Sequence, residues 1–402
     1  MARKSLLFLA FSLLLILPAT AQKARWYKGN LHTHSLWSDG DDYPEMIMEW
    51  YKQRGYDFVA LSDHNILAEG EKWVRITGDG TAREAFGKYL ARYGEDWVRH
   101  EQRGDTVRVQ LKTLQAYRHL FEEKEKFLII QAEEITDQFQ GKPVHMNATN
   151  LAELIKPQGG NSLVEVMQNN IDAVIAQRWH TGRPMIIHLN HPNFHWAITA
   201  EDLIALTGER FFEVFNGHPA VYNMGDADHH STEQIWDIVN ASYLQTGKMP
   251  LMGLATDDSH NYHRTGPALS NAGRGWIHVR ARNLTPAALI NAIEAGDFYA
   301  SSGVVLSDLK NTRKKMSVTV QAEPGVAYTI QFIGTVGKEV GKVLQETRGA
   351  RATYTFTGEE LYVRARIVSD KPMENPLEEA RYEMAWTQPA GWETAASPAA
   401  RK

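Results

Sequence analysis

The sequence predicts an α/β protein: a distorted seven-stranded (β/α) barrel of the TIM-like kind, followed by a small C-terminal antiparallel β domain. Two observations predict the barrel. Short apolar runs alternate with amphipathic segments between residues 26 and 295, a pattern typical of βα units around a parallel sheet. Nearly every apolar run ends in His, Asp or Glu, and in such barrels the chemistry lies at the C-terminal ends of the strands.

The first 21 residues are predicted to be a secretory signal peptide. Arg3 and Lys4 give a positive start, residues 6–18 form an apolar core, and Ala19-Thr20-Ala21 is a small-residue cleavage site. The apolar run is shorter than the ~20 residues that span a bilayer, and the lack of cysteine excludes a lipoprotein anchor. We therefore expect a periplasmic or secreted protein with no stable membrane anchor after cleavage.

The composition limits the ligands and partners. Without cysteine, a metal would be held by His, Asp and Glu, which suit zinc, manganese or iron. Removal of Arg3 and Lys4 lowers Lys and Arg from 43 to 41 against 48 Asp and Glu, so the formal net charge changes from −5 to −7. This charge argues against nucleic acid as a partner, because surfaces that bind it are normally basic.

The first predicted strand, residues 26–34, ends in two histidines. Side chains alternate along a strand, so the imidazoles of His32 and His34 leave the same face. Asp39 follows five residues later, just before Gly40, which permits a tight turn. Two nitrogen ligands and a nearby carboxylate at the end of a strand predict the beginning of a transition-metal site.

The remaining elements follow in order. Further strands are expected at residues 57–62, 127–130, 144–147, 184–187, 211–217 and 250–254, and helices at 45–54, 162–180, 199–207, 232–246 and 285–295. Residues 68–126 are more polar and predict an insertion with helices at 81–93 and 111–126. We expect the large domain to cover residues 22–308, the β domain 309–387, and a disordered Ala/Pro/Glu-rich tail 388–402.

Six motifs at predicted strand ends carry the candidate ligands. They are His32-Thr33-His34 with Asp39, Ser62-Asp63-His64-Asn65, Ala132-Glu133-Glu134-Ile135, His145, Asn190-His191-Pro192 and Asp258-Ser259-His260. With these six motifs in this order, the sequence resembles the PHP (polymerase and histidinol phosphatase) superfamily of metal-dependent hydrolases. Residues 275–276, 284–303 and 385–389 are also similar to the exported carbaryl-hydrolase-like group of that superfamily.

The resemblance implies a PHP barrel with a multinuclear metal site. His32, His34, Glu134 and Asp258 would hold one metal, and Glu134 would bridge to a second metal that His145 and His191 also bind. Asp39, His64 and His260 match the ligands of a third metal. Asp39 stands where some members of the superfamily have histidine. The number of divalent ions (Zn, Mn or Fe) therefore remains open between two and three.

Several other polar residues are weaker candidates. Asp63 is expected to orient a histidine ligand, and the basic residues His263, Arg264 and Arg274 form either an anion clamp or surface salt bridges. Glu213 and Asn216 either line the pocket or make structural hydrogen bonds. Two histidines, His188 and His195, lie beside the His191 motif. Each either contacts the substrate or has a structural role.

Two close divalent ions lower the pKa of a bridging water from 15.7 toward about 7, which predicts hydrolysis by a metal-bridging hydroxide. A small-molecule phosphate mono- or diester is the favoured substrate. A carbamate or aryl ester is the alternative, and a non-catalytic binding module that has kept the fold is a third reading. The oligomeric state does not follow from the sequence.

Overall fold

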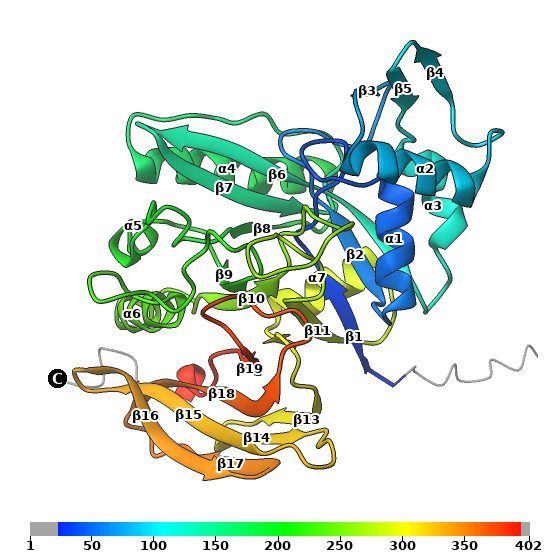
Figure 1. Cartoon of the computed structure of the whole chain (residues 1–402). Helices are drawn as coiled ribbons and strands as arrows, with labels where there is room; N and C mark the ends of the chain where they lie inside the picture. Colours follow the sequence, from blue (N-terminus) through cyan, green and yellow to red (C-terminus); the bar gives the residue numbers. More distant parts are fainter. Residues whose placement is uncertain (1–22, 395–402) are drawn as a thin grey trace, which may run out of the picture.

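A computed structural model describes residues 23–394, so the expected signal peptide lies outside the described residues (Figure 1). The chain forms a mixed α/β fold with a large central sheet and a further β region near the C-terminus. Between residues 23 and 394, none of the helices combines the length and the apolar character needed to cross a membrane.

All seven expected strands of the large domain are present. They are β1 (Arg25–Asn30), β2 (Phe58–Leu61), β6 (Leu128–Phe139), β7 (Lys142–Thr149), β8 (Ile186–Leu189), β9 (Phe211–Asn216) and β10 (Met252–Thr256). The strands lie in the order β10-β9-β8-β7-β6-β2-β1. Where the two ends of this order meet, the extension of β1 touches that of β10 through a single bridge between Thr33 and Ser259.

The predicted closed (β/α) barrel is not confirmed, because β1 and β10 do not pair as strands and meet only through that bridge. In addition, β7 runs antiparallel to both of its neighbours, β6 and β8. Gln140 and Gly141 join β6 to β7 with φ angles of 50° and 83°. Positive φ at both central residues is the conformation of the two-residue hairpin turns that match strand twist. The segment around residues 144–147 is therefore the return strand of a hairpin and not a βα unit.

Five helices accompany these strands: α1 (Pro44–Gln53), α4 (Leu163–Thr181), α5 (Ala200–Ile204), α6 (Thr232–Gln245) and α7 (Pro286–Glu294). The N-termini of α4, α5, α6 and α7 have side-chain caps, whereas that of α1 has none. Ser162 and Thr285 accept a hydrogen bond from the third backbone N–H of α4 and α7, and Ser231 forms a capping box with Gln234. Apolar residues of α4 and α6 pack with those of β7 to β10 in one core.

The insertion contains a sheet that the sequence did not predict. It comprises β3 (Trp73–Ile76), α2 (Thr81–Tyr93), β4 (His100–Arg103), β5 (Thr106–Gln110) and α3 (Leu114–Phe121), with strand order β3-β5-β4. The helix expected at 81–93 is confirmed, whereas the one expected at 111–126 is shorter.

The C-terminal region extends the central sheet and adds a second one. Its strands are β11 (Trp276–Ala281), β12 (Phe298–Ser301), β13 (Leu306–Asn311), β14 (Lys315–Val320), β15 (Tyr328–Val336), β16 (Glu339–Arg348), β17 (Arg351–Thr355), β18 (Glu360–Pro372) and β19 (Tyr382–Thr387). The central sheet continues β1-β11-β12-β19-β18-β15-β16, and β13-β14-β17 form the second sheet (Figure 1). Thus β19 crosses the expected boundary at residue 308 by pairing with both β12 and β18.

The expectation of disorder from residue 388 is wrong for the described part of the tail. Gln388 is buried, and its side chain accepts a hydrogen bond from the Gly253 N–H and donates one to the Gly253 carbonyl. Ala390 pairs with Val363, and a 3-10 turn covers Trp392–Thr394. Residues 395–402 lie outside the described residues.

A buried ion pair attaches α6 to the C-terminal region. Arg364, on β18, donates from Nε and Nη2 to the two carboxylate oxygens of Asp237 at 2.8 and 2.7 Å. Its Nη1 lies 2.8 Å from Glu233 Oε2, and Tyr362 donates to Asp237 Oδ1 at 2.6 Å. Arg364 is 1% exposed, so its removal would strand two carboxylates in the interior.

We expect Arg364→Ala to lower the free energy of unfolding by about 3–5 kcal/mol, because an uncompensated charge would remain buried. Arg366→Ala is the control: its guanidinium also meets Glu233, at 3.2 Å, but is 31% exposed. We expect that variant to lose no more than about 1 kcal/mol. Urea unfolding measures both values, and equal losses would contradict this account of the interface.

Candidate metal centre

The candidate ligands gather at the ends of neighbouring strands. His32 and His34 follow β1, His64 follows β2, Glu134 and His145 lie in β6 and β7, His191 follows β8, and Asp258 and His260 follow β10. Together with Asp39, which lies in the turn after His34, these residues make up three of the four clusters of potential ligand atoms in the described residues.

Four of the six separations between ligand atoms in the first cluster have the length expected for a tetrahedral site. The Nε2 atom of His32 lies 3.2 Å from both Glu134 Oε2 and Asp258 Oδ1. The Nε2 atom of His34 lies 3.1 and 3.2 Å from the same two oxygens. Ligands at about 2.0–2.1 Å from a tetrahedral ion are about 3.3 Å apart, so these four distances match edges of such a site.

The donor chemistry of this cluster also fits an ion. All four residues are buried, yet His34 Nε2 makes no hydrogen bond. Burial alone would lower the pKa of His34, but the carboxylates of Asp258 and Glu134 raise it to about 10. The site therefore favours positive charge, as a divalent cation would supply.

Glu134 faces a second group through its other oxygen. His145 Nδ1 lies 3.0 Å and His191 Nε2 lies 3.5 Å from Glu134 Oε1. Glu134 is thus shared between two groups, and His145 and His191 both approach its second oxygen. The cluster of potential ligand atoms here, however, consists of His64, Glu134 and His145 and does not include His191. His64 also approaches Glu134, with Nδ1 at 3.1 Å from Oε2.

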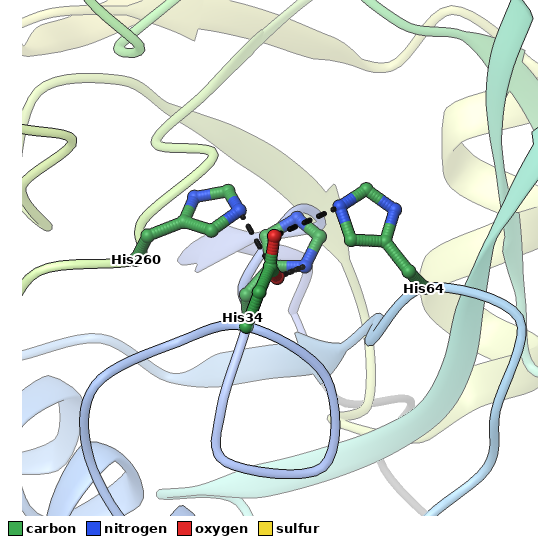
Figure 2. A group of neighbouring side chains, drawn as sticks. His34, His64 and His260 are labelled. Carbon is green, nitrogen blue, oxygen red and sulfur yellow. Dashed lines mark ion pairs between the residues drawn. The ribbon is translucent and has the colours of Figure 1, made fainter.

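The third group consists of His34, Asp39, His64 and His260. Figure 2 shows the three imidazoles directed toward one another. Asp39 Oδ1 lies 3.3 Å from His260 Nε2, and Oδ2 lies 3.6 Å from His64 Nε2. The Asp39 side chain is 56% exposed, whereas the carboxylates of the first cluster are buried, so the third group is the most open to solvent.

Glu213 holds His32 in the orientation that metal binding needs. Its Oε1 lies 2.7 Å from His32 Nδ1 and accepts from Thr256 Oγ1 at 2.7 Å, while Oε2 accepts from the His191 N–H at 2.9 Å. A carboxylate at Nδ1 keeps a proton there and leaves the Nε2 lone pair for a metal. Of the two alternatives for Glu213, the structure favours the structural hydrogen bond.

Glu133 and Glu134 point to opposite sides of β6, as alternation requires. Glu134 faces the histidines, whereas Glu133 Oε1 accepts from the Ile155 N–H at 2.7 Å. Glu133 Oε2 is buried without a hydrogen-bond partner. Burial raises the pKa of Glu133 to about 8.

The predicted anion clamp is wrong for Arg274. Arg274 is fully buried, and its guanidinium donates to the carbonyls of Gly217 and Gly266 at 2.8 Å each and to that of Asn375 at 2.9 Å. His263 lies 3.5 Å from Asp42, and Arg264 is exposed. Just after His260, the Tyr262 N–H donates to Asp41 Oδ1 at 2.8 Å.

Asp63 forms hydrogen bonds with the loop after His34 and does not hydrogen-bond to a histidine ligand. Its Oδ1 accepts from the Ser35 N–H at 2.8 Å and from Ser38 Oγ at 2.6 Å, and its Oδ2 accepts from Ser35 Oγ at 2.8 Å. These bonds fix the turn that carries Asp39. Among the two open histidines, His188 is buried with Nε2 3.4 Å from Glu213, and His195 is exposed.

One histidine near the centre escaped the sequence analysis. His218 follows β9, and its ring lies 5.8 Å from that of His260 and 5.8 Å from that of Phe194. Phe194 in turn contacts the rings of His145 and His191, at 6.0 and 5.0 Å. The only signal was position: His218 follows an apolar strand, as the ligand motifs do.

Comparisons with known proteins found no matching family model and no matching curated protein. Among solved structures, the chain is similar to a two-domain protein from Bacteroides vulgatus that contains a predicted PHP-like metal-dependent phosphoesterase. The identity is 12% and the TM-score 0.41, over 91% of this chain and 95% of the other. A putative metal-dependent phosphoesterase from Bifidobacterium adolescentis is also similar, at 12% identity and a TM-score of 0.30, over 58% and 87%.

We expect Glu213→Gln to weaken metal affinity about 10- to 100-fold, because partners that orient a ligand contribute that much. The amide cannot keep the same charge-assisted bond to His32 Nδ1. Titration of the metal-free protein with Zn²⁺ against a competing chelator measures the change. Glu133→Gln, on the opposite side of β6, is the matched control and should bind metal like the wild type; an equal loss in both variants would contradict the role given to Glu213.

The raised pKa of Glu133 predicts a pH-dependent stability. The folded protein keeps this proton up to about pH 8, whereas the unfolded chain releases it above about pH 4.5. Stability should therefore fall as pH rises between these values, by at most about 1.4 kcal/mol per pH unit. In metal-free protein, Glu133→Gln should be more stable relative to wild type at pH 8 than at pH 5; a constant difference would contradict the assignment.

Proposed function

We propose that this chain is an exported, metal-dependent hydrolase that cleaves phosphate mono- or diesters. The observation that carries the proposal is Glu134, which presents one oxygen to His32 and His34 and the other to His145 and His191. A carboxylate shared in this way suits two neighbouring ions. Such a pair would activate a water molecule as the nucleophile and stabilise charge on the substrate.

The residues of the chain have separate tasks in this proposal. Glu134 and Asp258 supply the negative charge that holds the ions, and Glu213 keeps the proton of His32 on Nδ1. Phe194 covers one side of the centre by contacting His145 and His191. The sequence contains no Gly-x-Ser-x-Gly nucleophile elbow, so the chain itself offers no sign of that covalent mechanism.

A second candidate function is hydrolysis of a carbamate or aryl ester at the same centre. The observation that favours it is the loss of the anion clamp, since Arg274 is committed to backbone carbonyls. A neutral ester needs no such clamp. A non-catalytic binding module is disfavoured, because every predicted ligand position is filled and the side chains converge.

We expect the metal-loaded protein to hydrolyse p-nitrophenyl phosphate or bis-p-nitrophenyl phosphate. Activity should be lost on chelation and return with Zn²⁺, Mn²⁺ or Fe²⁺. Asp258→Asn should lower kcat/KM by about 100-fold or more, because it removes a charge from the metal cluster. Asp226→Asn changes an exposed carboxylate that pairs with His229 and is the control.

Three outcomes distinguish the alternatives. Hydrolysis of 1-naphthyl acetate but of neither phosphate ester would replace the phosphoesterase proposal with the second candidate. Bound metal in elemental analysis without turnover of any of the three esters would favour the binding module. Turnover that survives chelation and Asp258→Asn would refute the metal centre as the place of catalysis.

A further inference from the structure

His218 lies at the mouth of the metal centre but is absent from all four clusters of potential metal ligands in the described residues. We propose that the His218 side chain donates a hydrogen bond from Nε2 to a substrate oxygen that gains negative charge during hydrolysis. The proposal rests on the proposed function, because it assigns a residue to that reaction. Three observations support it: the hydrogen bond that fixes the His218 backbone, the hydrogen bond at Nδ1, and the position of the ring beside His260 and Phe194.

The backbone of His218 is tied to the metal cluster through one amide side chain. Asn216 Oδ1 accepts the His218 N–H at 2.7 Å. The Nδ2 atom of the same side chain donates to Asp258 Oδ2 at 3.1 Å and to Glu213 Oε2 at 2.8 Å. Asn216 therefore fixes His218 relative to the carboxylate that would hold the ion and to the carboxylate that positions His32.

The loop around His218 is held from its other side as well. Asn223 donates from Nδ2 to the Asn216 carbonyl at 3.0 Å and accepts the Asn216 N–H at 2.9 Å. Arg274 donates to the Gly217 carbonyl at 2.8 Å. A Cβ atom on Gly217 would lie 2.7 Å from the Asp257 carbonyl oxygen, so this close approach requires glycine.

The hydrogen bond at Nδ1 determines which ring nitrogen carries the proton. Nδ1 accepts from the Ala220 N–H at 3.1 Å, so it has no proton of its own. A neutral imidazole then carries its proton on Nε2 and is a donor there. Burial lowers the pKa of His218 to about 4, which agrees with a neutral ring at neutral pH.

The place of the ring points to substrate as the acceptor. The ring is partly exposed beside His260 and Phe194, and Nε2 has no hydrogen-bond partner within residues 23–394. His260, whose Nδ1 bonds to the Asp258 carbonyl, would offer the lone pair of its Nε2 to a metal, whereas a protonated Nε2 cannot ligate an ion. An N–H donor aimed at developing charge typically contributes 100- to 1,000-fold to kcat.

Three variants test the proposal on the full-length, metal-loaded protein. His218→Ala should lower kcat for p-nitrophenyl phosphate at least 30-fold while zinc content stays unchanged. His218→Gln can present an amide N–H near the position of Nε2 and should retain at least ten times the kcat of His218→Ala. His195→Ala changes an exposed neighbouring histidine and should have wild-type kcat. Unchanged kcat in His218→Ala, or loss of its zinc, would overturn the proposal.

Two further measurements do not depend on catalytic turnover. Long-range ¹H–¹⁵N correlation spectra of the metal-free protein should contain one signal of an Nε2–H tautomer that His218→Ala removes; an Nδ1–H signal would overturn the proposal. Inorganic phosphate should bind zinc-loaded His218→Ala about tenfold more weakly than zinc-loaded wild type, and equal binding would count against a substrate contact. If wild type hydrolyses none of the esters, the proposed function fails, while these two results still decide on His218.

Discussion

Three buried carboxylates surround one imidazole, and this concentration of negative charge is the constraint on which the site depends. Glu134, Asp258 and Glu213 each lie within 3.2 Å of a ring nitrogen of His32. Within the described residues, no lysine or arginine forms an ion pair with any of the three. Burying charge without compensation is costly, so the imidazoles must carry protons or the centre must carry cations. Metal binding should accordingly release protons.

Buried polar side chains that bond to the backbone hold the loops around this charge. Asp63 fixes the turn after His34, Asn216 fixes the turn after β9, and Arg274 gathers carbonyls from three segments. None of these side chains belongs to a ligand cluster. Their contribution is to keep several strand ends in one register, so that ligands far apart in sequence meet within a few ångströms.

The sequence revealed the parts of the site that obey local rules. The alternation of Glu133 and Glu134 follows from the geometry of β6 alone. The pair His32 and His34 lies beyond the end of β1, in an extension that pairs only through Thr33, so the strand expected to reach residue 34 is shorter than predicted. Helices with clear caps, such as α4 and α7, were predicted to within one or two residues. Properties that depend on distant partners were not accessible in this way. Arg274 resembles a substrate clamp until its carbonyl partners are known, and His218 stands in no ligand motif.

The fold shows the same limit. The reversal of β7 depends on a two-residue turn. Whether the strand order closes into a barrel depends on how β10 meets β1. Neither property follows from a list of strands. The continuation of the sheet through β11, β12 and β19 depends on pairing across more than eighty residues, as between Ser301 and Ala385. The strands of the insertion sheet were missed because they are only four or five residues long, and the residues of β4 are mostly exposed.

The position of β19 has a consequence for how the protein is made. This strand lies between β12 and β18 in the central sheet, although it follows both of them in the sequence. The ribosome therefore makes β19 after both of its neighbours, and the facing edges of β12 and β18 cannot pair with it until it has emerged. Exposed strand edges invite wrong pairing, so the edges of β12 and β18 are open to aggregation until β19 pairs with them.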